Sequence, residues 1–130
     1  MPKILTIKRS KWRRGGGGIT INDNKGSTRL LNDKGLMCCL GFDAIGCGFT
    51  PADILGKVDP EELAHYAIAF PAGYLETRVE SDKSGHLTNS KPVFDAISAN
   101  DDRKLSDGQR ELKVRAALME LGWDYVVFVD

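Results

Sequence analysis

The C-terminal segment constrains the fold of this 130-residue chain more than any other feature. Residues 123–129 read Trp-Asp-Tyr-Val-Val-Phe-Val, so apolar, aromatic and β-branched side chains occupy both faces of an extended strand. A strand of this kind is expected at a central position in a sheet, with both faces covered. Because the only comparable strands lie in the N-terminal region, beginning with residues 3–9, we expect the two ends of the chain to pair.

The N-terminal region, residues 1–34, is predicted to be a basic β-meander. After its first strand, four consecutive glycines interrupt regular structure, and residues 19–21 form a second short strand. Residues 22–26 are dense in turn formers. Residues 27–31 are therefore expected to return as a hairpin partner.

Residues 35–47 are the least polar stretch of the chain and are predicted to form a helix. Apolar side chains lie on more than one face of this helix, as in a helix that is surrounded by other elements. Gly41, in its middle, is expected where another backbone packs close. Gly46 and Gly48 are expected to end the helix.

Capping patterns predict further helices between residues 50 and 102. Thr50 and Asp59 are N-cap residues, each followed by proline and by an acidic residue in the first turn. The helix after Asp59 is expected to continue to Phe70. A short helix begins at residues 92–97 and ends at residues 100–102.

The last helix, before the C-terminal strand, has the clearest local pattern. Ser106 and Gln109 form a capping box, and Glu111 and Arg115 have the spacing of an i,i+4 ion pair. Gly122 is expected to end the helix. The stripe expected to face the core consists of Leu112, Ala116 and Met119, joined by Ala117, Leu118 and Leu121.

Together these patterns predict a single domain of the α+β class. A small antiparallel or mixed sheet, built from the N-terminal strands and the C-terminal strand, packs against several short helices. Its parts are the β-rich residues 1–34, the helical residues 35–104 and the closing helix–strand unit of residues 105–130. The chain has 130 residues, 42% of them hydrophobic, which is enough for one core and too little for two ordinary domains.

The composition predicts a cytoplasmic protein without a membrane segment. No apolar stretch approaches the roughly 20 residues of a membrane span. The apolar run at the N-terminus is too short for a signal peptide. Cys38, Cys39 and Cys47 form an odd set in one apolar stretch, which is a poor disulfide framework and suits a reducing compartment. The oligomeric state stays open.

The net charge of zero hides a division along the chain. Residues 1–34 contain nine Lys/Arg and two Asp, a net charge of +7, whereas the other 96 residues contain nine Lys/Arg and sixteen Asp/Glu, a net charge of −7. Such an asymmetry favours an electrostatic partner. Helix capping explains most of the acidic groups, and the alternative is an acidic surface that competes with nucleic acid for a basic protein.

A basic segment at the end of the first strand is the main candidate binding site. Its cations surround one aromatic ring and precede a glycine run, which suits phosphate contact with base stacking. An acidic protein surface and a plain solvated strand end are the alternatives. The segment lacks the lysine and the following helix of a nucleotide-binding P-loop. The candidate residues are Lys8, Arg9, Lys11, Trp12, Arg13 and Arg14.

The paired thiols are interpreted as buried packing residues. Cys38 and Cys39 point about 100° apart on a helix, so they do not serve one surface together. The two histidines, His65 and His86, have no spacing that pairs them with a thiol or indicates a zinc site. We expect no catalytic residue, metal or cofactor. A small enzyme or zinc site that uses Cys38 or Cys39 is the second alternative.

The motif at residues 37–42, Met-Cys-Cys-Leu-Gly-Phe, with Leu-Leu shortly upstream, resembles a group of small bacteriophage and prophage proteins. Those proteins share a Cys-Cys-Leu-Gly helix and, further on, Asn-Asp followed by a helix and a closing hydrophobic strand. Here these pieces are residues 100–101 and the run to residues 122–128. The resemblance implies phage origin and a role in host takeover or in evasion of host defence.

The leading hypothesis is a phage accessory protein that binds a host macromolecule and inhibits or redirects it. A host-defence complex is one such target, as it is for an anti-CRISPR protein. The expected partner is a host protein or a protein–nucleic-acid complex in the host cytoplasm. The first alternative is a nucleic-acid-binding module that uses the basic segment.

Overall fold

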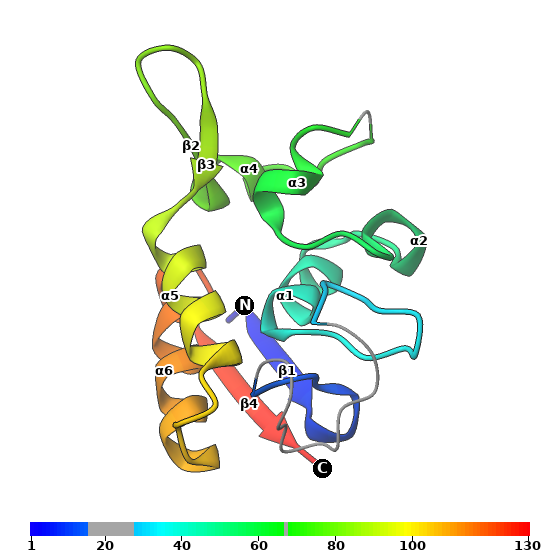
Figure 1. Cartoon of the computed structure of the whole chain (residues 1–130), viewed down its shortest axis with the longest axis vertical. Coiled ribbons are helices and arrows are strands. Elements are labelled where there is room, and N and C mark those ends of the chain that lie inside the picture. The colour runs from blue at the N-terminus through cyan, green and yellow to red at the C-terminus, as the bar shows by residue number, and fades with distance from the viewer. Residues whose placement is uncertain (16–27, 67) are drawn as a thin grey trace.

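The structure is a computed structural model that describes residues 1–15, 28–66 and 68–130 (Figure 1). It confirms the predicted α+β class. The strands are β1 (Ile4–Lys8), β2 (Val79–Ser81), β3 (Leu87–Asn89) and β4 (Tyr125–Val129). The helices are α1 (Cys39–Cys47), α2 (Pro51–Ile54), α3 (Pro60–Leu63), α4 (Tyr74–Arg78), α5 (Lys91–Asp101) and α6 (Asp107–Glu120), and a 3-10 helix, η1 (Arg9–Lys11), follows β1.

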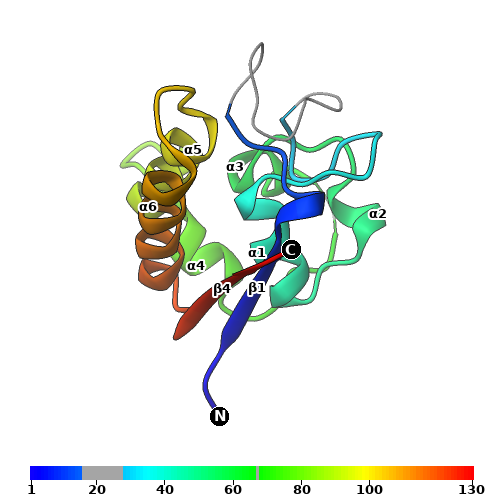
Figure 2. The same cartoon turned by 90° about the horizontal axis from the view of Figure 1, so that it is seen from below.

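The two ends of the chain pair, as the sequence predicted. β1 and β4 lie side by side in a parallel register that sets Ile4 opposite Tyr125 and Lys8 opposite Val129 (Figure 2). β2 and β3 form a separate antiparallel pair. In place of one antiparallel or mixed sheet, the described residues therefore contain two separate pairs of opposite type.

The described residues cover one face of the β1–β4 sheet. α1 packs against β1 and α6 packs against β4 (Figure 2). The side chains of Leu5, Ile7, Val126 and Phe128 are buried, and the alternate residues of both strands are exposed. The predicted central position of β4 is therefore wrong, because among the described residues β4 is an edge strand of a two-stranded sheet and its outer side chains are exposed.

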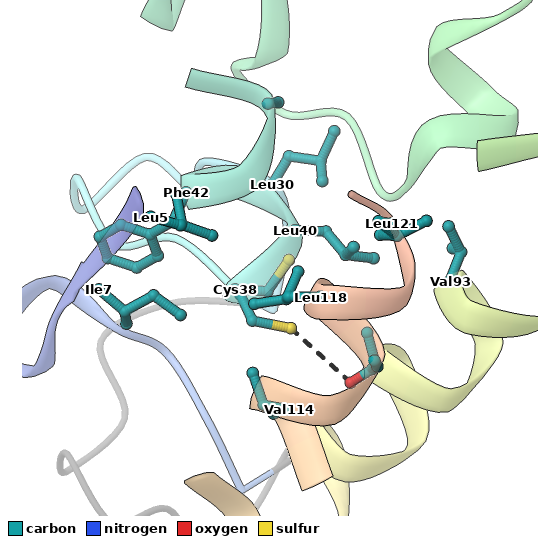
Figure 3. Close-up of a cluster of buried hydrophobic side chains, with 14 of the residues drawn as sticks. Leu5, Ile7, Leu30, Cys38, Leu40, Phe42, Val93, Val114, Leu118 and Leu121 are labelled. Atoms are coloured by element: carbon teal, nitrogen blue, oxygen red, sulfur yellow. Dashed lines mark hydrogen bonds between the residues drawn. The ribbon is translucent and has the colours of Figure 1, made fainter. Parts of the chain in front are cut away.

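The core is organised around α1, which begins at Cys39, so residues 35–38 of the predicted helix lead into it instead. A Cβ on Gly41 would collide with the carbonyl oxygen of Leu30, so this glycine permits the close backbone approach that the sequence suggested. Figure 3 shows part of the surrounding apolar cluster, which includes Leu5, Ile7, Leu40, Val93, Val114 and Leu118.

The helix ends confirm several capping signals and correct one. α1 ends at Gly48, which has a left-handed φ of 119°. The capping box predicted at Thr50 is present. α3 ends at Leu63, well before the predicted end at Phe70. Phe70 packs edge-to-face against Phe49, with ring centroids 5.9 Å apart, so tertiary packing places it without a continuous helix.

The buried face of α6 differs from the predicted stripe. Its buried residues are Arg110, Val114, Ala117 and Leu118. Ala117, Leu118 and Leu121 are buried, as predicted. Leu112, Ala116 and Met119 are exposed, so their predicted inward position is wrong. Arg110 also lies on the buried face of α6, although a hydrophobic pattern assigns an arginine to the surface. Its guanidinium donates hydrogen bonds of 2.7, 3.1 and 3.1 Å to the carbonyl oxygens of Ala99, Asn100 and Leu105.

The β2–β3 hairpin lies in a polar region for which the sequence patterns indicated no strand. It projects away from the β1–β4 sheet (Figure 1). In the N-terminal region, Leu31 forms an isolated bridge with Leu55, so residues 28–31 do not form the predicted hairpin strand. The predicted strand at residues 19–21 and the turn at residues 22–26 lie outside the described residues.

Within the described part of the chain, no helix is both long and apolar enough to cross a bilayer.

Candidate functional site

The structure divides the predicted basic site into an exposed part and a buried part. Lys8 and Lys11 are exposed and form no ion pair with the described residues. Trp12, Arg13 and Arg14 are only 0%, 2% and 6% exposed. The expectation that the basic segment forms an exposed surface around Trp12 is therefore wrong.

Trp12 is a core residue. Its ring centroid lies 5.3 Å from that of Phe128 on β4, and its indole N–H donates to Oδ1 of Asn100 at 2.7 Å. The guanidinium carbon of Arg14 lies 4.7 Å from the centre of the Trp12 ring. Because the indole is enclosed on these sides, it has no free face on which a nucleic-acid base stacks.

The two buried arginines hold the turn that follows β1. Nη1 of Arg14 donates to the carbonyl oxygens of Arg9 at 3.1 Å and Trp12 at 3.2 Å, and Nη1 of Arg13 donates to that of Arg14 at 3.3 Å. Burial lowers the pKa of both guanidiniums, and nearby aspartates partly offset that effect. Since arginine stays charged in proteins, these carbonyl contacts stabilise cations that are turned inward.

Arg9 is tied to α6 and to the C-terminal residue. Its Nε and Nη2 donate to Glu111 at 2.8 and 2.9 Å, and its Nη1 donates to Asp130 at 3.1 Å. The hydrogen bond to Glu111 raises the pKa of Arg9 above its ordinary value, and the weaker hydrogen bond to Asp130 raises it further. Desolvation of the guanidinium lowers this pKa but does not outweigh the two hydrogen bonds. Glu111 is thus hydrogen-bonded to Arg9 rather than to its predicted partner, Arg115.

Asn100 connects the turn after β1 to the start of α1. Its Oδ1 accepts hydrogen bonds from Trp12 and from the backbone N–H of Cys39 (3.0 Å), and its Nδ2 donates to the carbonyl oxygen of Arg13 (3.1 Å). Its own carbonyl oxygen accepts the N–H of Gly15 at 2.8 Å. The Cys-Cys-Leu-Gly and Asn-Asp motifs therefore meet at a structural junction, which the sequence indicated only as a helix end.

The paired thiols are buried, as expected. Cys38 is 5% exposed and Cys39 is 0% exposed. Burial raises the pKa of Cys38 to about 12 and that of Cys39 well above its usual value, so both stay protonated near neutral pH. Sγ of Cys39 donates to the carbonyl oxygen of Ala96 at 3.7 Å. Protonated, enclosed thiols are poor nucleophiles. Among the described residues, no group of three or more His, Cys, Asp or Glu is arranged to hold a metal ion.

A buried ion pair, which the sequence did not indicate, lies at the C-terminal half of α1. Asp43 is fully buried and accepts hydrogen bonds from Nε (2.8 Å) and Nη2 (2.6 Å) of Arg78 on α4. The indole N–H of Trp123 donates to the same carboxylate at 2.7 Å. Burial opposes the charge of Arg78, but the hydrogen bond and charge of Asp43 outweigh it and raise the pKa of Arg78. The pair links α1, α4 and the start of β4.

A cleft of about 650 Å³ adjoins this ion pair. Arg78, Cys47, Tyr74 and Trp123 are among the described residues that line it, and none of the lining residues is a histidine or a carboxylate. Burial, followed by the charge of Asp43, raises the pKa of Cys47 to about 11. The cleft therefore presents a protonated thiol and a neutralised guanidinium, without the acid–base groups that serve catalysis near neutral pH.

The outer face of the β1–β4 sheet is apolar and exposed. We define this outer face as Ile4, Thr6 and Lys8 of β1 with Tyr125, Val127 and Val129 of β4. Its four large apolar side chains, those of Ile4, Tyr125, Val127 and Val129, are 55%, 59%, 42% and 36% exposed. A parallel sheet is normally covered on both faces, and contiguous exposed apolar surface marks interaction sites.

Two further exposed apolar residues form a stripe on α6, which packs on the covered face of the sheet. Leu112 and Met119 are 64% and 44% exposed and lie three residues before and four residues after Arg115, on the same side of the helix. Nε of Arg115 donates to the carbonyl oxygen of Val126 at 3.1 Å, and its guanidinium lies 5.3 Å from the centre of the Phe128 ring. Arg115 thereby joins the exposed stripe of α6 to strand β4.

Comparisons with known proteins add no second line of evidence. No protein-family model, no curated protein sequence and no solved structure matches this chain.

Proposed function

We propose that this protein acts by stoichiometric binding to another protein, through the outer face of its β1–β4 sheet. The observation that carries the proposal is the exposure of Ile4, Tyr125, Val127 and Val129 on one side of a parallel strand pair. Burying a large apolar side chain that is half exposed contributes about 1 kcal/mol to an association. Four such side chains on rigid strands are a preorganised docking surface.

The distribution of polar groups supports binding over catalysis. Burial keeps the thiols of Cys38, Cys39 and Cys47 protonated. Beside the cleft, Asp43 and Arg78 form an ion pair in which the two charges neutralise each other. An aromatic anchor such as Tyr125, surrounded by aliphatic side chains, is typical of the energetic centre of a protein interface.

The phage resemblance of the Cys-Cys-Leu-Gly and Asn-Asp motifs suggests the kind of partner. In our proposal the protein is a phage accessory protein, the partner is a host macromolecule, such as a component of a defence complex, and the place of action is the host cytoplasm. The structural role of both motifs, at the junction around Asn100, is compatible with a scaffold that different binding surfaces use.

The nucleic-acid alternative has less support than the protein partner. Trp12, Arg13 and Arg14 are engaged in the interior, so only Lys8, Lys11 and half-buried Arg9 remain at the surface. Three cations give a small electrostatic contribution, since affinity for nucleic acid depends on the number of neutralised phosphates. A binding assay at low salt with generic DNA and RNA tests this alternative, and binding that falls steeply with added salt would favour it.

Affinity capture from a bacterial lysate tests the proposal. The baits are the wild-type chain, the outer-face variant Val127→Glu, and a matched control, Leu55→Glu, whose side chain is 51% exposed outside the sheet. We expect the wild type and the Leu55 variant to retain the same proteins and the Val127 variant to lose them. Equal capture by all three baits, or none above background, would contradict the proposal.

A further inference from the structure

The cleft beside the Asp43–Arg78 ion pair has the size of a small-molecule site. Its volume of about 650 Å³ lies within the roughly 300–1,000 Å³ that such sites usually have. Residues before β1, at the end of α1, on α4 and before β4 line it, and Trp123 and Leu121 are among its apolar lining residues. Because the indole of Trp123 is held by its hydrogen bond to Asp43, this wall of the cleft is fixed in the folded chain.

The polar side chains of the cleft offer donors rather than acceptors. Asp43 accepts hydrogen bonds from Nε and Nη2 of Arg78. The Sγ of Cys47 and the Oγ1 of Thr77 accept one further hydrogen bond each. A guanidinium has five N–H groups, so one N–H on Nη1 of Arg78 has no acceptor among the described residues. The hydroxyl of Tyr74, another lining residue, also has no partner there. Since no described lining residue is a carboxylate or a histidine, the cleft suits a ligand that brings acceptors.

Lys3 supplies a positive charge that is not balanced by an ion pair with the described residues. Asp124 accepts the backbone N–H of Lys3 at 2.7 Å and forms no ion pair with its ammonium. Burial, followed by the charge of Asp43, raises the pKa of Cys47, and the charges of Arg78 and Lys3 oppose that rise. The ammonium of Lys3 therefore acts on the thiol inside the cleft. Because Asp43 balances Arg78, Lys3 is the lining cation that remains for a ligand.

We propose that this cleft binds a small organic carboxylate, whose charged group meets Lys3 and the spare N–H of Arg78 and whose flat apolar body packs against Trp123. A carboxylate brings acceptors to a cleft whose side chains supply donors, and its single charge matches the one cation without an ion pair. A phosphate ester carries up to two charges and calls for more cations than the cleft provides. This site is separate from the proposed protein interface, because Val127 does not line the cleft.

The probe for this site is 2-naphthoate, which joins one carboxylate to a flat apolar body. At the binding efficiency usual for small ligands, a probe with about 13 non-hydrogen atoms has a dissociation constant on the order of 1 mM. The matched neutral probe is 2-naphthamide, which has the same body and no charge. We expect the amide to bind at least about fivefold more weakly, because it loses the charge-assisted contact with Lys3.

NMR titration of the full chain, labelled with ¹⁵N, tests the site. With 2-naphthoate, the indole N–H of Trp123 and the backbone N–H groups of Gly46 and Cys47 should shift along one saturation curve. The indole N–H of Trp12, which is enclosed in the core, should not shift. Three outcomes overturn the proposal: no saturable shift at the cleft, shifts confined to the outer face of the sheet, and equal binding of the amide. Tighter binding of 2-naphthyl phosphate overturns the carboxylate as the ligand class.

Substitution of Lys3 tests which cation holds the carboxylate. Lys3→Gln should weaken the binding of 2-naphthoate about fivefold and leave the binding of the amide unchanged. The matched control is Lys8→Gln, which removes the same charge from the other end of β1, where the residue does not line the cleft. Both lysines are exposed, so both variants should fold. Equal weakening by the two substitutions, or none by Lys3→Gln, overturns the assignment of Lys3.

Filling the cleft tests where the probes bind. Ala72 is exposed and lines the cleft, so Ala72→Phe places a ring in the cleft without disturbing a buried residue. This variant should lose the binding of both probes. Binding of 2-naphthoate with unchanged affinity would place the probe elsewhere and overturn the proposal.

Discussion

The turn after β1 and the outer face of the sheet adjoin each other at Lys8 but differ in which kind of side chain is buried. Arg13 and Arg14, whose charges suit water, are buried, whereas Tyr125 and Val127, whose apolar groups suit a core, are exposed. The buried arginines are compensated by backbone carbonyl oxygens and by the Trp12 ring. The exposed apolar residues have no compensation in the described chain. This difference is the reason why we propose the outer face, and not the turn, as the surface for a partner.

The largest effect on stability is expected at Trp12, where a substitution tests whether the turn after β1 is part of the core. Trp12→Ala should lower the free energy of unfolding by about 4 kcal/mol, because it removes a fully buried indole and leaves a cavity beside Phe128. Urea denaturation followed by circular dichroism measures the change. Trp12→Phe keeps an aromatic ring and loses the hydrogen bond to Asn100, so it should cost about half as much and stays measurable if the alanine variant does not fold. A loss below about 1 kcal/mol for Trp12→Ala would show that the turn is not part of the core.

Asn100→Ala should have the next largest effect. It removes the side chain that bonds Trp12, Cys39 and Arg13, and it leaves buried polar groups unpaired, for a loss of about 3 kcal/mol in the free energy of unfolding. The control is Ser98→Ala, an exposed position on the same helix, with an expected change within about 0.5 kcal/mol. Hydrogen exchange of the Trp12 indole N–H, seen by NMR, should accelerate in the Asn100 variant. Equal stability of the two variants would contradict a junction at Asn100.

The buried thiols predict an intermediate effect that depends on pH. Burial raises the pKa of Cys38 to about 12 in the folded state from a reference of 9.0, so the folded state retains a proton that the unfolded state loses. The stabilisation is complete below pH 9 and decreases as the pH rises toward the folded-state pKa. We expect the free energy of unfolding to fall by about 1 kcal/mol per buried thiol between pH 9 and pH 10. Cys38→Ala should show a smaller fall than the wild type, and identical slopes would contradict the burial of this thiol.

The smallest effect on stability is expected for a substitution on the outer face of the sheet. Val127→Ser should change the free energy of unfolding by no more than about 0.5 kcal/mol, because its side chain is already 42% exposed. The same substitution should reduce capture of partner proteins. A loss of more than about 1.5 kcal/mol would show that the outer face is covered by another part of the chain and is not free for a partner.

Local patterns predicted much of the fold. Pairing of the two chain ends followed from the lack of any other comparable strand, and the caps at Thr50, Ser106 and Gly122 follow from backbone hydrogen bonds that nearest neighbours satisfy. The buried face of α6 was not predictable in this way. Arg110 is buried because carbonyl oxygens at the C-terminal end of α5 accept its hydrogen bonds. These acceptors lie on another helix, 10 and 11 residues earlier in the chain, so the local pattern of α6 does not indicate them.

The candidate site was harder to predict than the fold. The basic segment was predicted to be an exposed binding site, but Arg13 and Arg14 are buried and hold the turn after β1. The Asp43–Arg78 pair joins residues 35 positions apart and has no local signal. The outer face was misjudged because apolar side chains on both sides of a strand normally indicate that both sides are covered.

The sequence by itself determined that this chain has helices with defined ends, a buried Cys-Cys-Leu-Gly segment and a C-terminal strand that pairs with an N-terminal strand. These properties depend on side-chain chemistry and short-range hydrogen bonds. Only the tertiary structure decided that Trp12, Arg13 and Arg14 turn inward and that Tyr125 and Val127 face outward. Which side of a strand is covered depends on where distant helices pack, and α1 and α6 both pack on the same side of this sheet.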